Sequence, residues 1–114
     1  MSAGDWKELY KAVTEGDFSL VQLHTQGGVN LNYQHPEILM TVLVTAIRYG
    51  HTEMALYFLN NGADPGLESH FDQLTPLEAA LKYKNREVLA KLKEMGFELP
   101  WYKRLIGKYF KSST

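Results

Sequence analysis

Residues 40–65 read MTVLVTAIRYGHTEMALYFLNNGADP, and residues 74–99 read LTPLEAALKYKNREVLAKLKEMGFEL. The two stretches align without a gap when one is shifted by 34 residues, and Thr41, Ala46 and Gly62 then coincide with Thr75, Ala80 and Gly96. An earlier and weaker copy joins the same register through Leu9 and Ala12. A chain that repeats itself at such a period predicts stacked copies of one supersecondary unit, each of which buries its apolar face against its neighbours.

Each unit predicts two helices joined by a short turn. In the third unit Thr75 is placed to cap a helix, Pro76 takes the first helical position, and Glu78 is placed to complete a capping box. Asn85 is placed to cap the second helix, and Gly96 to follow it in a left-handed conformation. The same register predicts the other helices over residues 5–15, 17–26, 41–49 and 52–61.

Two columns of the alignment hold only small residues. The alanine column consists of Ala12, Ala46 and Ala80, and the glycine column of Gly28, Gly62 and Gly96. We interpret the alanines as the places where helices of neighbouring units approach closely, and the glycines as left-handed helix ends.

The stretches 40–65 and 74–99 resemble ankyrin repeats. The family's pattern is Thr-Pro-Leu-His, two alanines, Gly-His, an apolar second helix and Gly-Ala-Asp. The resemblance implies an all-α ankyrin-repeat solenoid of three helix-turn-helix repeats joined by hairpin-like fingers, with a C-terminal capping helix. We expect a single domain over residues 1–114, with repeats at approximately 5–34, 35–68 and 69–99 and a cap or basic tail at 100–114.

The chain departs from the family pattern in three respects. Its period is 34 rather than about 33 residues, which places an extra residue in each connection and shifts the finger positions. The histidine of the motif is replaced by Tyr10, Val44 and Glu78 in the three units. Lys84 stands at the mid-turn position that Gly16 and Gly50 occupy in the earlier units.

The composition limits the class of protein. The chain has 114 residues, a net charge of −1 and no cysteine, so disulfides, cysteine nucleophiles and cysteine-based zinc sites are excluded. The N-terminal residues lack the basic start and apolar run of a secretory signal, and we expect a cytoplasmic protein that is a monomer on its own. The near-neutral charge argues against nucleic acid as the partner of the whole chain.

Candidate catalytic and metal-binding residues are few. Glu68, His70 and Asp72 alternate on a predicted connection and would face one way on an extended strand, but we favour a polar solvated finger, because zinc sites normally need a clearer ligand set. Ser69 adjoins His70, yet neighbours on a strand point apart. His51 matches the Gly-His turn of the family, which implies a structural imidazole. We therefore expect no enzyme activity, no cofactor and no small-molecule substrate.

The C-terminal residues 101–114 carry four basic side chains and no acid. Trp101, Leu105 and Tyr109 recur at helical spacing on one face. We expect a helix that covers the apolar face of the third unit. The alternative is peripheral membrane or nucleic-acid association through this basic aromatic tail.

The resemblance also implies where a partner binds. The two positions before each mid-turn line the concave groove of ankyrin repeats, and by register they are Thr14 and Glu15, Arg48 and Tyr49, and Lys82 and Tyr83. Tyrosine and arginine are enriched at binding hot spots, although stacking of Tyr49 and Tyr83 between units is an alternative explanation. We expect the exposed finger tips to add Ile38, Met40, Phe71 and Leu74. The predicted function is protein binding through this surface, as an adaptor or as a blocking or inhibitory subunit.

Overall fold

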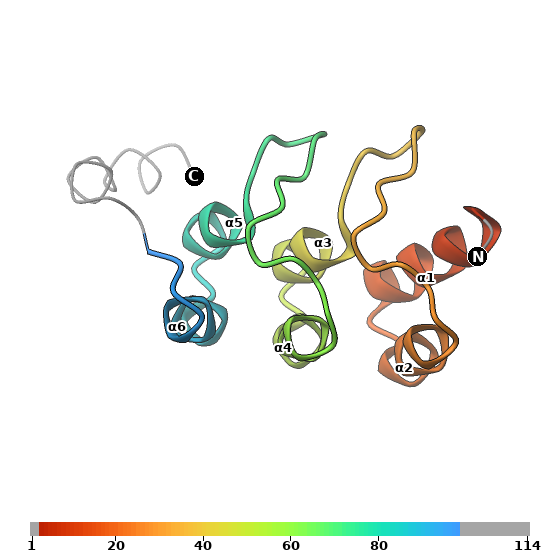
Figure 1. Ribbon diagram of the computed structural model, residues 1–114, viewed down its shortest axis with the longest axis horizontal. Coiled ribbons are helices and arrows are strands. Elements are labelled where there is room, and N and C mark those ends of the chain that lie inside the picture. The colour runs from red at the N-terminus through yellow and green to blue at the C-terminus, as the bar shows by residue number, and fades with distance from the viewer. Residues whose placement is uncertain (1–2, 99–114) are drawn as a thin grey trace.

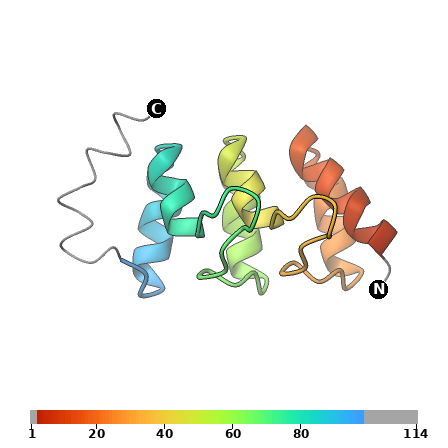
Figure 2. The same cartoon turned by 90° about the horizontal axis from the view of Figure 1, so that it is seen from above.

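The computed structural model describes residues 3–98, which form three antiparallel helix pairs (Figure 1). The helices are α1 (Ala3–Glu15), α2 (Phe18–Gln26), α3 (Val42–Arg48), α4 (Thr52–Asn60), α5 (Pro76–Lys82) and α6 (Arg86–Glu94). Helices α1, α3 and α5 form an inner row and α2, α4 and α6 an outer row, and the pairs follow one another along the long axis (Figure 2). The expected all-α solenoid is confirmed. The predictions for residues 99–114 lie outside the described residues.

Two long connections project from the inner row (Figure 1). We call residues 27–41 the first finger and residues 61–75 the second finger. Neither contains a regular strand, and in residues 3–98 the one isolated bridge joins Ser69 and Leu74. None of the described helices is long and apolar enough to cross a membrane.

The helix starts follow the predicted capping. The Thr75 hydroxyl accepts the main-chain N–H of Glu78 at 3.2 Å, and Glu78 Oε1 accepts the main-chain N–H of Thr75 at 3.0 Å. This reciprocal pair is a complete capping box, with Pro76 in the first turn. Asn85 Oδ1 accepts the N–H of Val88 at 3.1 Å and caps α6 in the same way.

The turns between the two helices of each repeat share one backbone conformation. We call residues 16–17, 49–51 and 83–85 the first, second and third turns. Gly16 and Gly50 adopt φ values of 75° and 76°, and Lys84 adopts 57° at the same position. Lysine therefore keeps the left-handed geometry that glycine adopts more easily.

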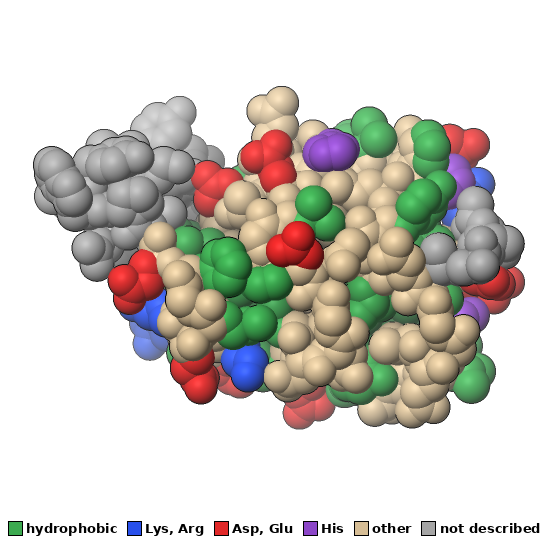
Figure 3. All heavy atoms as spheres, in the orientation of Figure 1, with side chains coloured by type: hydrophobic (Ala, Val, Ile, Leu, Met, Phe, Trp, Pro, Cys, Tyr) green, Lys and Arg blue, Asp and Glu red, His purple; other side chains and the backbone are tan. Residues whose placement is uncertain are grey.

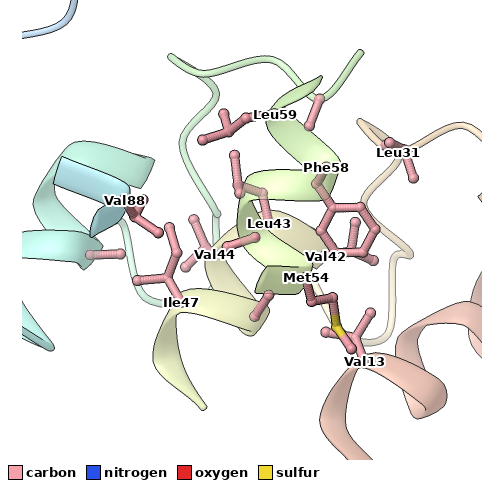
Figure 4. Close-up of a cluster of buried hydrophobic side chains, with 14 of the residues drawn as sticks. Val13, Leu31, Val42, Leu43, Val44, Ile47, Met54, Phe58, Leu59 and Val88 are labelled. Atoms are coloured by element: carbon pink, nitrogen blue, oxygen red, sulfur yellow. The ribbon is translucent and has the colours of Figure 1, made fainter. Parts of the chain in front are cut away.

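The core lies between the inner and outer rows and continues from repeat to repeat (Figure 4). Val44 and Ile47 of α3 are buried, and Val88 of α6 and Ile47 point toward one another. Met54 of α4 points toward Val13 of α1, so the second repeat shares apolar contacts with both neighbours (Figure 4). The alanine column is buried as well, with Ala12, Ala46 and Ala80 at 1%, 0% and 0% exposure. Small side chains there let α1, α3 and α5 pack closely.

Tyr10, at the position of the motif histidine in the first repeat, joins an aromatic cluster. Its ring stacks on Trp6 with 5.2 Å between centroids, and its hydroxyl donates to the Met40 sulfur at 3.6 Å. Trp6 is fully buried and also contacts the rings of Tyr33 and His35. The cluster attaches the first finger to the first helix and buries the apolar surface of the N-terminal repeat.

Candidate protein-binding surface

The predicted groove residues lie at the C-terminal ends of the inner helices, one pair in each repeat. Arg48 and Tyr49 are exposed, and the guanidinium lies 5.9 Å from the centroid of the Tyr49 ring. Lys82 and Tyr83 repeat this arrangement in the third repeat, with the ammonium 5.6 Å from the ring centroid. Each pair places a cation on an aromatic face.

The first repeat differs from the other two at these positions. The Thr14 hydroxyl donates to the carbonyl oxygen of Lys11 at 2.8 Å, and Glu15 is exposed. The first repeat therefore has a hydroxyl and a carboxylate at the two positions where the other repeats have a cation and an aromatic ring. The row of turns is consequently acidic in the first repeat and basic in the third.

The two tyrosines of the cation–aromatic pairs, Tyr49 and Tyr83, have different surroundings. Tyr49 is 51% exposed and stacks on His51 of its own turn, with 6.3 Å between ring centroids. Tyr83 is half-buried and packs against the core. Tyr49 is thus available to a partner over half of its surface, whereas Tyr83 also supports the fold.

The finger residues do not all lie where the sequence predicts. Met40 and Leu74 are only 4% and 8% exposed, so the expectation that they stand free at the finger tips is wrong. Each directly precedes the cap of an inner helix, where the finger has already returned to the core. Ile38 is half-buried against the core, and Phe71 is 67% exposed, as expected.

Leu39 is an exposed finger residue that the sequence reasoning missed. It is 40% exposed and adopts a φ of 58°. Its carbonyl oxygen accepts the main-chain N–H of Phe71 at 2.8 Å, which joins the tips of the two fingers. Hydrophobic side chains reach the surface along the upper edge of the molecule, over the fingers (Figure 3). No feature of the sequence separates Leu39 from the neighbouring Ile38 and Met40; in the structure Gln73, 34 residues later, has the same left-handed conformation.

Two side-chain amides of the first finger bind the second finger. Asn32 donates to the carbonyl oxygen of Gly62 at 3.2 Å and accepts the main-chain N–H of Asp64 at 2.7 Å. Gln34 donates to the carbonyl oxygen of Glu68 at 3.1 Å and accepts the main-chain N–H of His70 at 2.9 Å. Each amide replaces a pair of missing strand hydrogen bonds, so the fingers are held at a fixed separation.

A depression separates each turn from the next. The one between the second and third turns has a volume of about 420 Å³, and the one between the first and second turns about 380 Å³. The larger is lined by Ile47, Arg48, Gly50, Thr52, Tyr83, Lys84, Asn85, Arg86 and Glu87. The larger depression therefore adjoins the cation–aromatic pairs of two repeats.

The family is decided by a match along most of the chain. A family model described as ankyrin repeats (3 copies) matches residues 9–100. The chain belongs to the ankyrin-repeat family. It is also similar to the 2-5A-dependent ribonuclease of Homo sapiens, with 39% identity over 59 residues. That match covers 52% of this chain, and the chain spans about 8% of the length of the ribonuclease.

Ankyrin repeats are generally protein-interaction modules without catalysis of their own. Ser69, considered above beside His70, and His51, expected to be structural, both contact a neighbouring part of the fold. Ser69 is fully buried, and its hydroxyl oxygen accepts the main-chain N–H of Thr41 at 3.2 Å. His51 packs on the first turn, where a Cβ added to Gly16 would lie 2.9 Å from His51 Cε1. Both residues thus join neighbouring ankyrin repeats.

Glu68, His70 and Asp72 of the second finger do not form a metal site in the structure. Glu68 and His70 are exposed, whereas the carboxylate oxygens of Asp72 are buried without a hydrogen-bond partner. Within residues 3–98 there is no group of three side chains arranged to hold a metal ion.

Proposed function

We propose that this chain is a non-catalytic binding module that holds one partner protein on its concave surface. The proposed contact residues are Thr14, Glu15, Leu39, Arg48, Tyr49, Phe71, Lys82 and Tyr83. The observation that carries the proposal is the recurrence of a cation–aromatic pair at the same place in consecutive repeats. Neither Arg48 nor Tyr49 is buried by the fold, and tyrosine and arginine contribute disproportionately to protein interfaces.

The rigidity of the surface also supports the proposal. The four hydrogen bonds from Asn32 and Gln34 order the fingers before any partner arrives. A surface that is ordered in advance loses little conformational entropy when it binds. Occupation of a partner's surface by such a module is enough to block that partner or to connect it to another protein. An adaptor or inhibitory role follows from this mode of action.

The proposal is tested by affinity capture from native cells, with quantification of the captured proteins. The variant Arg48→Ala with Tyr49→Ala removes one exposed pair and little of the core. Its matched control is Leu23→Ala, since Leu23 is 64% exposed on α2 of the outer row. We expect the double variant to capture about one tenth or less of the partner that the wild type captures. The control should capture as much partner as the wild type.

Thermal unfolding of each variant separates lost contacts from lost folding. Equal capture by the wild type and the double variant, with unchanged melting temperatures, would contradict binding through this surface. A wild-type protein that captures nothing beyond an unrelated bait would contradict protein binding altogether.

A further inference from the structure

The depression between the second and third turns is lined by three cations. Arg48, Lys84 and Arg86 contribute to its wall, and Glu87 is the acid there. All three cations are exposed, and none of them forms an ion pair with another of residues 3–98. With Glu87 included, the lining holds three positive charges and one negative charge, and such an excess of like charge raises the free energy of the folded state.

The depression between the first and second turns provides an internal comparison. It is lined by Gly16, Phe18, Gly50, His51, Thr52, Glu53 and Met54, with no lysine or arginine. By register, Lys84 replaces a glycine and Arg86 replaces Phe18 and Thr52. The repeat architecture therefore forms such a depression without cations, and the basic lining belongs to the third repeat.

Lys84 carries a second cost. Its φ of 57° lies in the left-handed region, where Gly16 and Gly50 stand in the other two repeats. A side chain in this conformation is less favourable than glycine, because Cβ approaches the following carbonyl oxygen. Lys84 is exposed and therefore gains little from packing in return. Strain together with unneutralised charge points to a role outside folding.

We infer that this depression binds an acidic segment of a partner protein, with carboxylates between Arg48, Lys84 and Arg86. An arginine guanidinium donates two parallel hydrogen bonds to a carboxylate, and Lys84 adds a third positive charge. The Tyr83 ring supplies an apolar wall for the stem of an acidic side chain. The inference rests on the proposed function, since Arg48 and Tyr83 are among the proposed contact residues. It specifies the chemistry of the partner.

The first experiment is a titration of the isotopically labelled chain with a hexaglutamate peptide, followed by backbone amide NMR. We expect the largest shifts at Gly50 and at residues 84–87, and weaker binding as sodium chloride rises. The variant Lys84→Gln with Arg86→Gln should bind the peptide about fivefold more weakly. Its control, Lys91→Gln with Lys93→Gln, removes two charges from the last turn of the same helix and should bind as the wild type does.

Two further ligands serve as controls, a polycation for the sign of the charge and inorganic phosphate for a small anion. Hexalysine should produce no shifts in the depression, and inorganic phosphate should displace hexaglutamate only at concentrations far above those of the peptide. Equal weakening in both double variants would reduce the effect to net charge and overturn the inference. Phosphate that competes as strongly as the peptide would overturn it in favour of a small-anion site.

The second experiment uses Lys84→Gly, which restores the residue of the other two turns. We expect a higher melting temperature together with weaker hexaglutamate binding, because strain and charge are removed at once. A variant that gains stability and binds the peptide unchanged would contradict a role for Lys84. The affinity capture described above separates the two proposals. If the partner is lost with Arg48→Ala and Tyr49→Ala but is still captured with Lys84→Gln and Arg86→Gln, the proposed binding surface is supported and the recognition of an acidic segment is contradicted.

Discussion

Gln34 of the first finger accepts the main-chain N–H of His70 in the second finger at 2.9 Å. The same side chain donates to the carbonyl oxygen of Glu68 at 3.1 Å. One amide thus provides both hydrogen bonds that a neighbouring strand would provide at this point. The two fingers are thus joined here through a side chain, as they are at Asn32, and through main-chain atoms between Leu39 and Phe71.

Replacement of Gln34 by alanine is expected to loosen the second finger. Both main-chain groups are near the surface, so the loss of the two hydrogen bonds should cost about 1–2 kcal/mol of unfolding free energy. Hydrogen exchange at His70 should accelerate more than exchange in the core of α3. The control is Gln22→Ala on the exposed surface of α2, which should leave both quantities unchanged. Unaltered exchange at His70 in the Gln34 variant would show that the fingers keep their register without the amide.

Leu39→Gly is expected to separate stability from binding. Leu39 adopts a φ of 58° and Gln73 a φ of 56°. The variants Leu39→Gly and Gln73→Gly should therefore both relieve backbone strain. We expect each variant to gain about 0.5–1 kcal/mol in chemical denaturation. Only Leu39→Gly removes an exposed apolar side chain, and only this variant should lose captured partner. The role of Leu39 in binding is contradicted if both variants capture the partner equally well.

Gly16→Ala and Gly50→Ala form a matched pair that measures the contact between the first two repeats. Their φ values of 75° and 76° are nearly the same, so the conformational cost of alanine should be similar, about 1 kcal/mol. At Gly16 the new Cβ would also meet His51 Cε1 at 2.9 Å, whereas at Gly50 nothing lies within 4 Å. We expect Gly16→Ala to be about 1 kcal/mol less stable than Gly50→Ala in urea denaturation. Equal stabilities would mean that His51 moves aside at no cost.

Thr75→Ala tests the capping box of α5. The hydroxyl accepts the N–H of Glu78 at 3.2 Å, and its removal leaves a helix donor without a partner. We expect a loss of about 1 kcal/mol in unfolding free energy. Thr75→Ser keeps the hydroxyl and is the control. Should the serine variant lose as much stability as the alanine variant, the methyl group rather than the cap would be the important part of Thr75.

The local features of the fold follow from the sequence because they depend on neighbours in the chain. Thr75 and Glu78 are three residues apart, and that spacing alone permits the reciprocal bonds of the capping box. The alanine column was predictable for a related reason, since a repeated register places equivalent residues at equivalent depths. The proposal that Arg48 and Tyr49 contact a partner came from the same register together with the family resemblance.

The finger residues escape this reasoning. Met40 and Leu74 look like exposed apolar tips in the sequence, yet both are buried, and the neighbouring Leu39 is exposed instead. Leu39 and Gln73 adopt left-handed φ values of 58° and 56°, so the side chains around them do not alternate as in a strand, and the extra residue in each connection leaves their positions undetermined in the sequence. Helical periodicity predicts which residues of a helix are buried. It gives no such information for the fingers, which have no helical or strand periodicity.

The sequence by itself determined the three repeats, the ends of their helices and the small residues between them, because capping and helical periodicity act over a few residues. Only the tertiary structure decided that Arg48 meets Lys84 and Arg86 across one depression, and that Gln34 reaches the main chain of the second finger. These residues are separated by more than thirty positions, and their proximity follows from how one repeat packs on the next. The surface on which we propose binding is therefore a product of stacking.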